Sequence, residues 1–241
     1  MTVEKMGKMS RRRTPETQKS HVVKGDGPEI LSQFMSVSRE TLDRLKIYVD
    51  LVLRWQPAQN LIAPSTIPEI WRRHVADSLQ PHLCLPEAKR WLDFGSGAGF
   101  PAIVTAILLA DVADSHVYMV ESNQRKAAFL RTALRETGSH GTVISSRIES
   151  VAEHWDHGPV DALSARALAS LDVLCGFSAP FSAQGATAVF HKGREFLREI
   201  NEASHLWTFD LVEQSSLIDP ESRMLLVSNI SVRSTEEGLS G

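Results

Sequence analysis

The chain has 241 residues, of which 42% are hydrophobic, and it carries a formal net charge of −3. This length allows one sizeable core, and the near-neutral balance lacks the global basic charge that marks many nucleic-acid binders. The two cysteines show no pairing pattern, which predicts a protein of the reducing cytoplasm without a disulfide framework. No apolar run approaches the roughly 18 residues of a membrane span, so we expect no membrane partner.

Residues 1 to about 35 are rich in lysine and arginine and contain few apolar residues. Such a segment cannot bury enough surface to order itself, so we expect a disordered basic tail. Its positive charge would attract RNA. A solubilising extension has the same composition, so the role of the tail stays open.

A small helical section is expected over residues 36–85. It begins at one of the serines at 36 and 38, either of which can cap a helix. Apolar residues then recur at three- and four-residue steps to about residue 55, and Pro57 is expected to end this helix. A second helix is expected over residues 68–79, with a proline in its first turn.

From residue 90 onward, short apolar runs of strand length alternate with segments of helical periodicity. The runs are RWLDF, HVYMVES, GTVISSR, VDALSAR, ATAVFHK, FDLVEQSS and RMLLVSNISV. This alternation predicts that residues 86–235 form a doubly wound α/β domain, with a mostly parallel seven-stranded sheet that ends in a hairpin-like pair. Ser122 and Gly138 are expected to cap the helix between the second and third strands, and ESVAEHW is expected to be helical.

Three glycines, Gly95, Gly97 and Gly99, follow the first predicted strand. Ligands of open parallel sheets bind beyond the carboxyl ends of the strands, and a backbone without side chains lets a ligand approach closely. The pattern lacks the third spaced glycine of a dinucleotide fingerprint and the Lys-Ser or Lys-Thr of a P-loop. Glu121 ends the second strand, where a carboxylate can accept hydrogen bonds from both ribose hydroxyls. These features predict a nucleoside-containing cofactor without a pyrophosphate.

The stretch LDFGSGAGFP resembles the cofactor loop of class I, Rossmann-like methyltransferases that use S-adenosyl-L-methionine. More narrowly, the chain resembles the bacterial 16S rRNA guanine-N7 methyltransferase family, formerly called glucose-inhibited division protein B. The matching stretches are NLI at 60–62, RHVADSL at 73–79, the glycine loop, SRIE at 146–149, SARA at 164–167 and HKG at 191–193. The resemblance extends over residues 40 to 230. It implies a methyltransferase whose partner is 16S ribosomal RNA or the small ribosomal subunit, and we expect a cytoplasmic monomer.

The resemblance also implies that Gly95, Phe100, Ile148, Glu149 and Arg166 line the cofactor site. Ile148 would offer apolar surface to adenine, and Glu149 would accept from the adenine amino group, unless a backbone contact takes its place. Arg166 ends the fourth strand without an acidic neighbour in sequence. Its guanidinium suits the methionine carboxylate or an RNA phosphate, which makes it the one candidate for a catalytic role.

Asn60, His74 and Lys192 are candidate substrate residues, and Lys192 suits an RNA phosphate. His74 and Asp77 share one face of the predicted helix. Two ligands make a poor metal site, so we expect this pair to hold the helical section on the sheet or to shape the cleft. Asp93 is expected to organise the glycine turn or to meet the cofactor ammonium. Guanine N7 carries no proton, so catalysis requires alignment more than a general base.

Three alternatives remain open from the sequence. A nicotinamide-dependent Rossmann enzyme is disfavoured by the missing glycine. A non-catalytic RNA-binding protein would bind RNA and leave the cofactor site empty. A methyltransferase acting on another RNA stays an alternative, whereas one acting on a small molecule is disfavoured by the ordered series of matching stretches.

Overall fold

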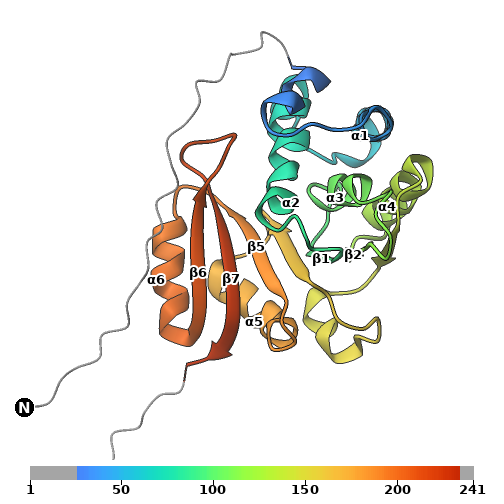
Figure 1. Cartoon of the computed structure of the whole chain (residues 1–241). Coiled ribbons are helices and arrows are strands. Elements are labelled where there is room, and N and C mark those ends of the chain that lie inside the picture. The colour runs from blue at the N-terminus through green and yellow to red at the C-terminus, as the bar shows by residue number, and fades with distance from the viewer. Residues whose placement is uncertain (1–25, 234–241) are drawn as a thin grey trace, which may run out of the picture.

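The computed structural model describes residues 26–233, and these form one seven-stranded sheet with helices on both faces (Figure 1). The strands lie in the order β3-β2-β1-β4-β5-β7-β6. Their bounds are β1 Arg90–Phe94, β2 His116–Val120, β3 Gly141–Ile144, β4 Ala162–Arg166, β5 Thr187–Lys192, β6 Trp207–Ser215 and β7 Arg223–Val232. The first five strands are parallel, whereas β7 is antiparallel to β5 and β6. The predicted doubly wound sheet and its closing antiparallel pair are confirmed.

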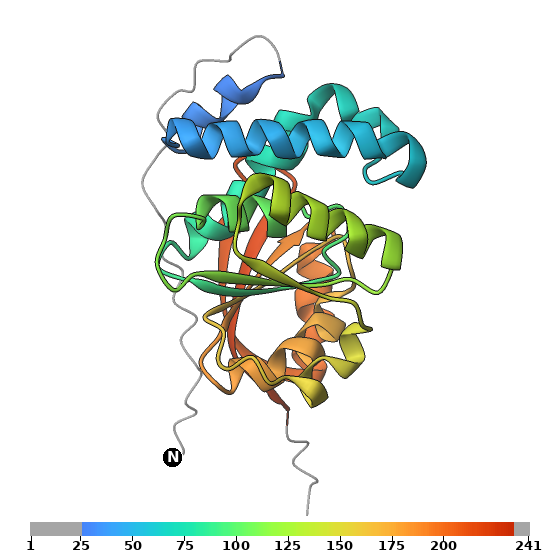
Figure 2. The ribbon, with the colours of Figure 1, turned by 90° about the vertical axis from the view of Figure 1, so that its right-hand side faces the viewer.

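The helices lie in layers on the two faces of the sheet (Figure 2). Helices α3 (Ala102–Leu108) and α4 (Gln124–Thr137) cover one face. Helices α5 (Leu171–Ser182) and α6 (Phe196–Leu206) cover the other face. The long α1 (Arg39–Gln59) lies outside α3 and α4 and packs against both.

Side-chain alternation along the strands divides the apolar interior into two cores. Trp91 of β1 and Met119 of β2 belong to the core under α1, α3 and α4. Leu92 and Phe94 of β1 point the other way, into the core shared with α5. Because successive strand residues face opposite sides, one five-residue strand supplies both cores.

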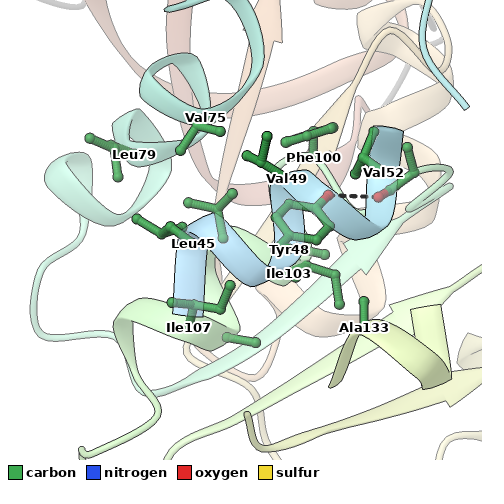
Figure 3. Close-up of a cluster of buried hydrophobic side chains, with 14 of the residues drawn as sticks. Leu45, Tyr48, Val49, Val52, Val75, Leu79, Phe100, Ile103, Ile107 and Ala133 are labelled. Carbon is green, nitrogen blue, oxygen red and sulfur yellow. Dashed lines mark hydrogen bonds between the residues drawn. The ribbon is translucent and has the colours of Figure 1, made fainter. Parts of the chain in front are cut away.

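Helix α1 reaches the turn that follows β1. The Tyr48 side chain is fully buried, and its hydroxyl donates a 2.6 Å hydrogen bond to the carbonyl oxygen of Ala98. Its ring centroid lies 5.0 Å from that of Phe100. Figure 3 shows Tyr48 next to Phe100 and Ile103, with this hydrogen bond drawn dashed. The helical section therefore contacts the glycine turn directly.

The predicted start of α1 is confirmed, but its predicted end is wrong. The Ser38 side chain accepts from the Thr41 amide at 3.1 Å. The helix continues past Pro57 to Gln59 and ends at Asn60, whose φ is 48°. Pro57 lies in the last turn, so the missing N–H removes only one hydrogen bond, and the helix tolerates this loss.

Residues 64–84 form a segmented helical path instead of one helix over 68–79. A 3-10 turn over Pro64–Glu69 is followed by a π-helical turn over Trp71–Ala76. A second 3-10 turn, Asp77–Leu79, then leads into α2 (Gln80–Cys84). Changes of helical pitch of this kind rotate the side chains that follow, and π-helical turns often occur at functional sites.

Ordered structure also begins earlier than residue 36. Pro28–Gln33 form a 3-10 helix, and the side chains of Ile30 and Leu31 are buried. Both carboxylate oxygens of Asp26 accept from backbone amides, those of Trp71 and Arg72, at 2.9 and 2.8 Å. The remainder of the predicted tail, residues 1–25, lies outside the described residues.

Two local predictions differ from the structure, and one is confirmed. Helix α4 is capped by Asn123 instead of Ser122, because the Asn123 side chain accepts from two amides of the first turn. ESVAEHW forms two short 3-10 turns, Ile148–Ser150 and Ala152–His154, instead of a helix. Gly138 ends α4 as predicted, with φ at 61°. Within residues 26–233, no helix is both long and apolar enough to span a bilayer.

Candidate functional site

The glycine turn lies at the carboxyl end of β1, where the strand order reverses between β1 and β4. Gly97 has φ at +57°, and a Cβ placed there would meet nothing nearer than the Gly95 oxygen, at 3.7 Å. The Gly97 side of the turn is therefore open to a ligand. On Gly99, a Cβ would collide with Ile103 and approach the Tyr48 hydroxyl to 3.0 Å. Gly99 thus allows close packing of α1 and α3, and only its backbone is available to a cofactor.

Glu121 follows β2 and connects two backbone segments. Its Oε2 accepts from the Gly97 amide at 2.8 Å, and its Oε1 accepts from the Asn123 amide at 2.7 Å. The residue is 8% exposed. A carboxylate has about four acceptor sites, so two remain for ribose hydroxyls. The predicted ribose contact stays a prediction, and the structure adds a role in holding the turn against β2.

Asp93 lies beneath the turn and is 1% exposed. The Ser164 hydroxyl of β4 donates to Asp93 Oδ1 at 2.6 Å. Burial raises the pKa of the Asp93 carboxyl to about 6, and the Ser164 hydrogen bond opposes part of that rise. The hydroxyl of Ser96 donates to the Asp93 carbonyl oxygen at 3.3 Å. Asp93 therefore connects β1 to β4 and steadies the turn, which favours the structural half of its predicted role.

Arg166 has an acidic partner that its sequence neighbours do not reveal. One guanidinium nitrogen lies 3.1 Å from Asp77 Oδ2, and the other lies 3.1 Å from His74 Nδ1. The guanidinium also lies over the Phe100 ring, 5.4 Å from its centroid. The predicted partners of Arg166, a cofactor carboxylate or an RNA phosphate, would therefore share the guanidinium with Asp77 and His74. As expected, Asp77 and His74 attach the helical section to the sheet.

His74 is held as a neutral ring. Burial lowers the pKa of His74 to about 4, with a further contribution from the Arg166 charge. Its Nε2 lies 2.7 Å from the Thr66 hydroxyl, which itself donates to the Ala63 carbonyl oxygen. We therefore place the ring proton on Nε2, which leaves Nδ1 to accept from Arg166. No group of three His, Cys, Asp or Glu residues suited to a metal ion occurs in the described part of the chain.

The other predicted site residues occupy different environments. Ile148 is half-buried and Glu149 is exposed, and both lie in the turn after β3, at the same edge of the sheet as the glycine turn. Asn60 is exposed at the end of α1. Lys192 is 6% exposed and donates to Glu199 Oε2 and the Ala169 carbonyl oxygen, both at 2.6 Å. Lys192 is therefore a buried, paired cation and not a solvated surface charge.

A cavity of about 280 Å³ lies beyond the carboxyl ends of β4 and β5. Ala165, Leu168, His191, Lys192 and Glu199 are among its lining residues. A Cβ on Gly95 would lie 2.6 Å from Leu168 Cδ1, so this cavity adjoins the glycine turn at Leu168. Nothing in the sequence pointed to Glu199, Thr66 or Tyr48. None of the three belongs to a recognisable local motif.

The chain is similar to a family of known methyltransferases over most of its length. The model of the family described as rRNA small subunit methyltransferase G matches residues 41–225. The ribosomal RNA small subunit methyltransferase G of Rhizobium leguminosarum bv. trifolii (strain WSM2304) is 50% identical over 81% of this chain and 96% of its own length. The protein of the same name from Rhodopseudomonas palustris (strain BisB5) is 49% identical over 77% of this chain and 79% of its own length.

Solved structures of other methyltransferases share the fold. An O-methyltransferase from Bacillus cereus, solved in complex with SAH, aligns with a TM-score of 0.53 at 10% identity, over 84% of this chain and 96% of that chain. The O-methyltransferase TomG from Streptomyces achromogenes, solved in complex with SAM, aligns with a TM-score of 0.53 at 13% identity, over 83% of this chain and 94% of that chain. At these identities the likeness concerns the fold alone.

Proposed function

This chain belongs to the rRNA small subunit methyltransferase G family, and we propose that it transfers a methyl group from S-adenosylmethionine to N7 of a guanine in 16S ribosomal RNA. The observation that carries the proposal is the family match over residues 41–225, which includes the glycine turn, Glu121, Arg166 and the cavity. The chain also covers 96% of the length of one relative in this family, so the match extends well beyond the cofactor loop.

The residues at the carboxyl edge of the sheet fit S-adenosylmethionine. The turn is open at Gly97, and Glu121 beside it has acceptor sites left for ribose hydroxyls. Half-buried Ile148 supplies apolar surface, whereas Phe100 is buried beneath the Arg166 guanidinium and supports it. Arg166 has five N–H donors, so a carboxylate can share them with Asp77 and His74. The proposed cofactor contacts are Gly95, Gly97, Gly99, Phe100, Glu121, Ile148, Glu149 and Arg166.

The chemistry demands little of the protein beyond position. When bound, S-adenosylmethionine supplies a methyl group on a positively charged sulfur, and the electron pair of the broken bond returns to that sulfur. Guanine N7 offers a lone pair and has no proton to lose, so the chain needs no general base. What the site residues contribute is alignment of the two reactants and exclusion of water. Neutral His74 and the paired Arg166 suit this role, because neither has to exchange a proton.

The partner and the setting follow from the same proposal. Guanine N7 lies in the deep major groove of an A-form helix, so we infer that the target guanine is unpaired or turned out of its helix. We also propose that the protein acts as a monomer in the cytoplasm on rRNA or on the small subunit. Sedimentation of the purified protein tests the monomer.

The decisive experiment is methyl transfer from labelled S-adenosylmethionine to ribosomal RNA taken from cells that lack this protein. We expect incorporation into 16S rRNA at one guanine, with the label on N7 when the modified base is mapped. The same RNA from cells that contain the protein is the control, and it should accept no label. Label on another atom, or no label, would contradict the proposal.

A further inference from the structure

The cavity of about 280 Å³ beyond β4 and β5 is lined by both apolar and polar residues. Ala165 at the end of β4, Leu168 after it and Leu174 of α5 supply small or apolar side chains. The polar side chains of its lining belong to His191, Lys192 and Glu199. Leu168 lines the cavity and also packs against Gly95, so the cavity adjoins the cofactor turn. A molecule seated in the cavity would therefore lie next to the place where the methyl group is expected. Polar groups placed in a binding cavity fix the orientation of the ligand that it receives.

The charged groups on the wall neutralise one another. The Lys192 ammonium lies 2.6 Å from Glu199 Oε2 and 2.6 Å from the Ala169 carbonyl oxygen. Glu199 Oε2 also accepts from the Leu171 amide, at 2.9 Å. Two of the three N–H donors of Lys192 are used and Glu199 balances its charge, so Lys192 attracts an anion less than an unpaired cation would. A phosphate binds best to cations that have no other partner. The cavity therefore suits an uncharged base better than a phosphate.

Glu199 presents one unused acceptor. Its Oε1 accepts no hydrogen bond from residues 26–233, and it is not sealed from the surroundings. The carboxylate cannot easily turn, because Oε2 is held by both the Lys192 ammonium and the Leu171 amide. Oε1 is thus a fixed acceptor on a residue of the cavity wall. An ionised carboxylate only accepts, so it selects a ligand that brings an N–H donor.

We propose that this cavity receives the base of the target guanosine and that Glu199 Oε1 accepts a hydrogen bond from its exocyclic N2 amino group. This inference rests on the proposed function and names the residue that recognises the base. The amino group and N7 lie on opposite sides of the purine, so a guanine bound to Glu199 points N7 away from it. Adenine has an equivalent N7 but no amino group at C2, so this contact makes N7 transfer selective for guanine.

The test compares two RNAs that differ by one amino group. The guanosine modified by the wild-type protein is mapped and then replaced by inosine, which keeps N7 and N1–H and lacks the N2 amino group. We expect kcat/KM for the inosine RNA to be about 10- to 100-fold lower, the range of a hydrogen bond to a charged group. Equal methylation of the two RNAs by the wild-type protein overturns the inference without any variant.

Glu199→Gln provides the second arm. Lys192 and the Leu171 amide both need an acceptor, so the glutamine oxygen should replace Oε2, and the amide nitrogen should replace Oε1. A donor would then face the guanine amino group, and the preference for guanosine over inosine should disappear. The matched control is Glu202→Gln, on the same helix but in an exposed surface pair with Arg198. That variant should keep the wild-type preference.

The outcomes separate the two proposals. A Glu199→Gln protein that keeps the wild-type preference for guanosine contradicts the role of Glu199. If the variant does not fold, as judged by its unfolding transition and cofactor affinity, the wild-type comparison of the two RNAs still decides. No transfer to the guanosine RNA by the wild-type protein contradicts the proposed function itself.

Discussion

At the scale of single residues, the glycine turn is held from two sides. Glu121 binds its Gly97 amide from β2, and Asp93 supports it from below through Ser164 of β4. Both carboxylates are nearly buried, so each satisfies backbone or hydroxyl donors that would otherwise be unpaired. The turn is therefore formed by the protein's own contacts, and a ligand has little left to organise.

Gly97→Ala is expected to weaken S-adenosylmethionine binding without unfolding the protein. The left-handed φ of Gly97 costs alanine about 1–2 kcal/mol, and the new methyl group enters the open side of the turn. Gly138→Ala is the matched control, because Gly138 has φ at +61° and also has open space. Calorimetric titration should show lost affinity for the first variant only. Equal affinities in the two folded variants would contradict a ligand at Gly97.

Asp93 should make the stability of the protein depend on pH. Its pKa is raised to about 6 in the folded state, whereas the unfolded chain loses this proton near pH 4. Between these values the folded state binds more protons, so stability falls as pH rises from about 4 to 6 and stays lower above that. The loss is at most roughly 3 kcal/mol. Denaturant unfolding of Asp93→Asn should show a smaller decline over this window, and an unchanged profile would refute the raised pKa.

Arg166→Ala is expected to lose methyl transfer, and two measurements identify its ligand. If Arg166 binds the methionine carboxylate, as we propose, cofactor affinity without RNA falls by about 10- to 100-fold. If it binds an RNA phosphate, cofactor affinity is unchanged and the salt dependence of RNA binding becomes shallower by about one counterion. Asp77→Asn is the control for attachment of the helical section. If Arg166→Ala and Asp77→Asn lower stability equally and Arg166→Ala keeps wild-type turnover, the role of Arg166 is structural.

At the scale of secondary-structure elements, the helical path from Pro64 to Cys84 changes pitch three times. As a result, the side chains of His74 and Asp77 both point toward the sheet. The π-helical turn presents His74 to Phe100, with ring centroids 5.0 Å apart. The Asp77 carboxylate, just after this turn, accepts from Arg166. The backbone carbonyl oxygen of Asp77 lies 3.1 Å from Nε2 of His191. These contacts fix the helical section over the carboxyl ends of β4 and β5.

Asn60 at the end of α1 provides a test at this scale. Its φ of 48° is left-handed, so Asn60→Gly should keep the helix end, whereas Asn60→Ala should cost about 1–2 kcal/mol. The glycine variant removes the side chain and its 3.4 Å contact with Gln56 while leaving the backbone unstrained. If Asn60 contacts substrate, the glycine variant loses activity despite its wild-type stability. Thermal unfolding and rRNA methylation of the two variants separate these roles.

What the sequence predicts well is what local chemistry determines. The alternation of strands and helices, the serine cap of α1 and the glycine end of α4 all depend on neighbouring residues, and all three are confirmed. What it predicts poorly depends on distant partners. Asp26 caps residues about 45 positions away, and Asp77 pairs with Arg166 across 89 positions. No periodicity or spacing connects such residues, because only the assembled sheet brings them together.

At the scale of the whole molecule, the helical section and the sheet share one core. The buried side chains of α1, the π-helical turn, β1, α3 and α4 form one continuous apolar cluster. The loop between β6 and β7 is also attached to the helical section, because the Leu217 amide donates to Oε1 of Gln80 in α2 at 2.7 Å. Although we describe residues 36–85 and 86–235 as two units, we therefore expect them to unfold together.

Truncation tests where the ordered structure begins. Removing residues 1–33 deletes the buried Ile30 and Leu31 and the Asp26 cap, and each buried side chain contributes about 1.5–3 kcal/mol. We expect this truncation to lower the midpoint of thermal unfolding. Removing residues 1–25 keeps all three residues and should leave cofactor affinity and the unfolding midpoint unchanged. Identical behaviour of the two proteins would show that residues 26–33 add nothing to stability.

The hydrogen bond from Tyr48 to Ala98 also bears on how the protein is made. Helix α1 leaves the ribosome before the segments that it packs against are synthesised. The Ala98 carbonyl oxygen, which accepts from Tyr48, lies 50 residues further along the chain. At about 5–20 residues per second, that delay lasts roughly 3–10 seconds. During this interval the apolar face of α1, with Leu45, Val49 and Val52, has no α3 or α4 to cover it. The nascent chain therefore passes through a stage in which its first long helix is available to chaperones, and this stage lasts until α3 and α4 have emerged after the glycine turn.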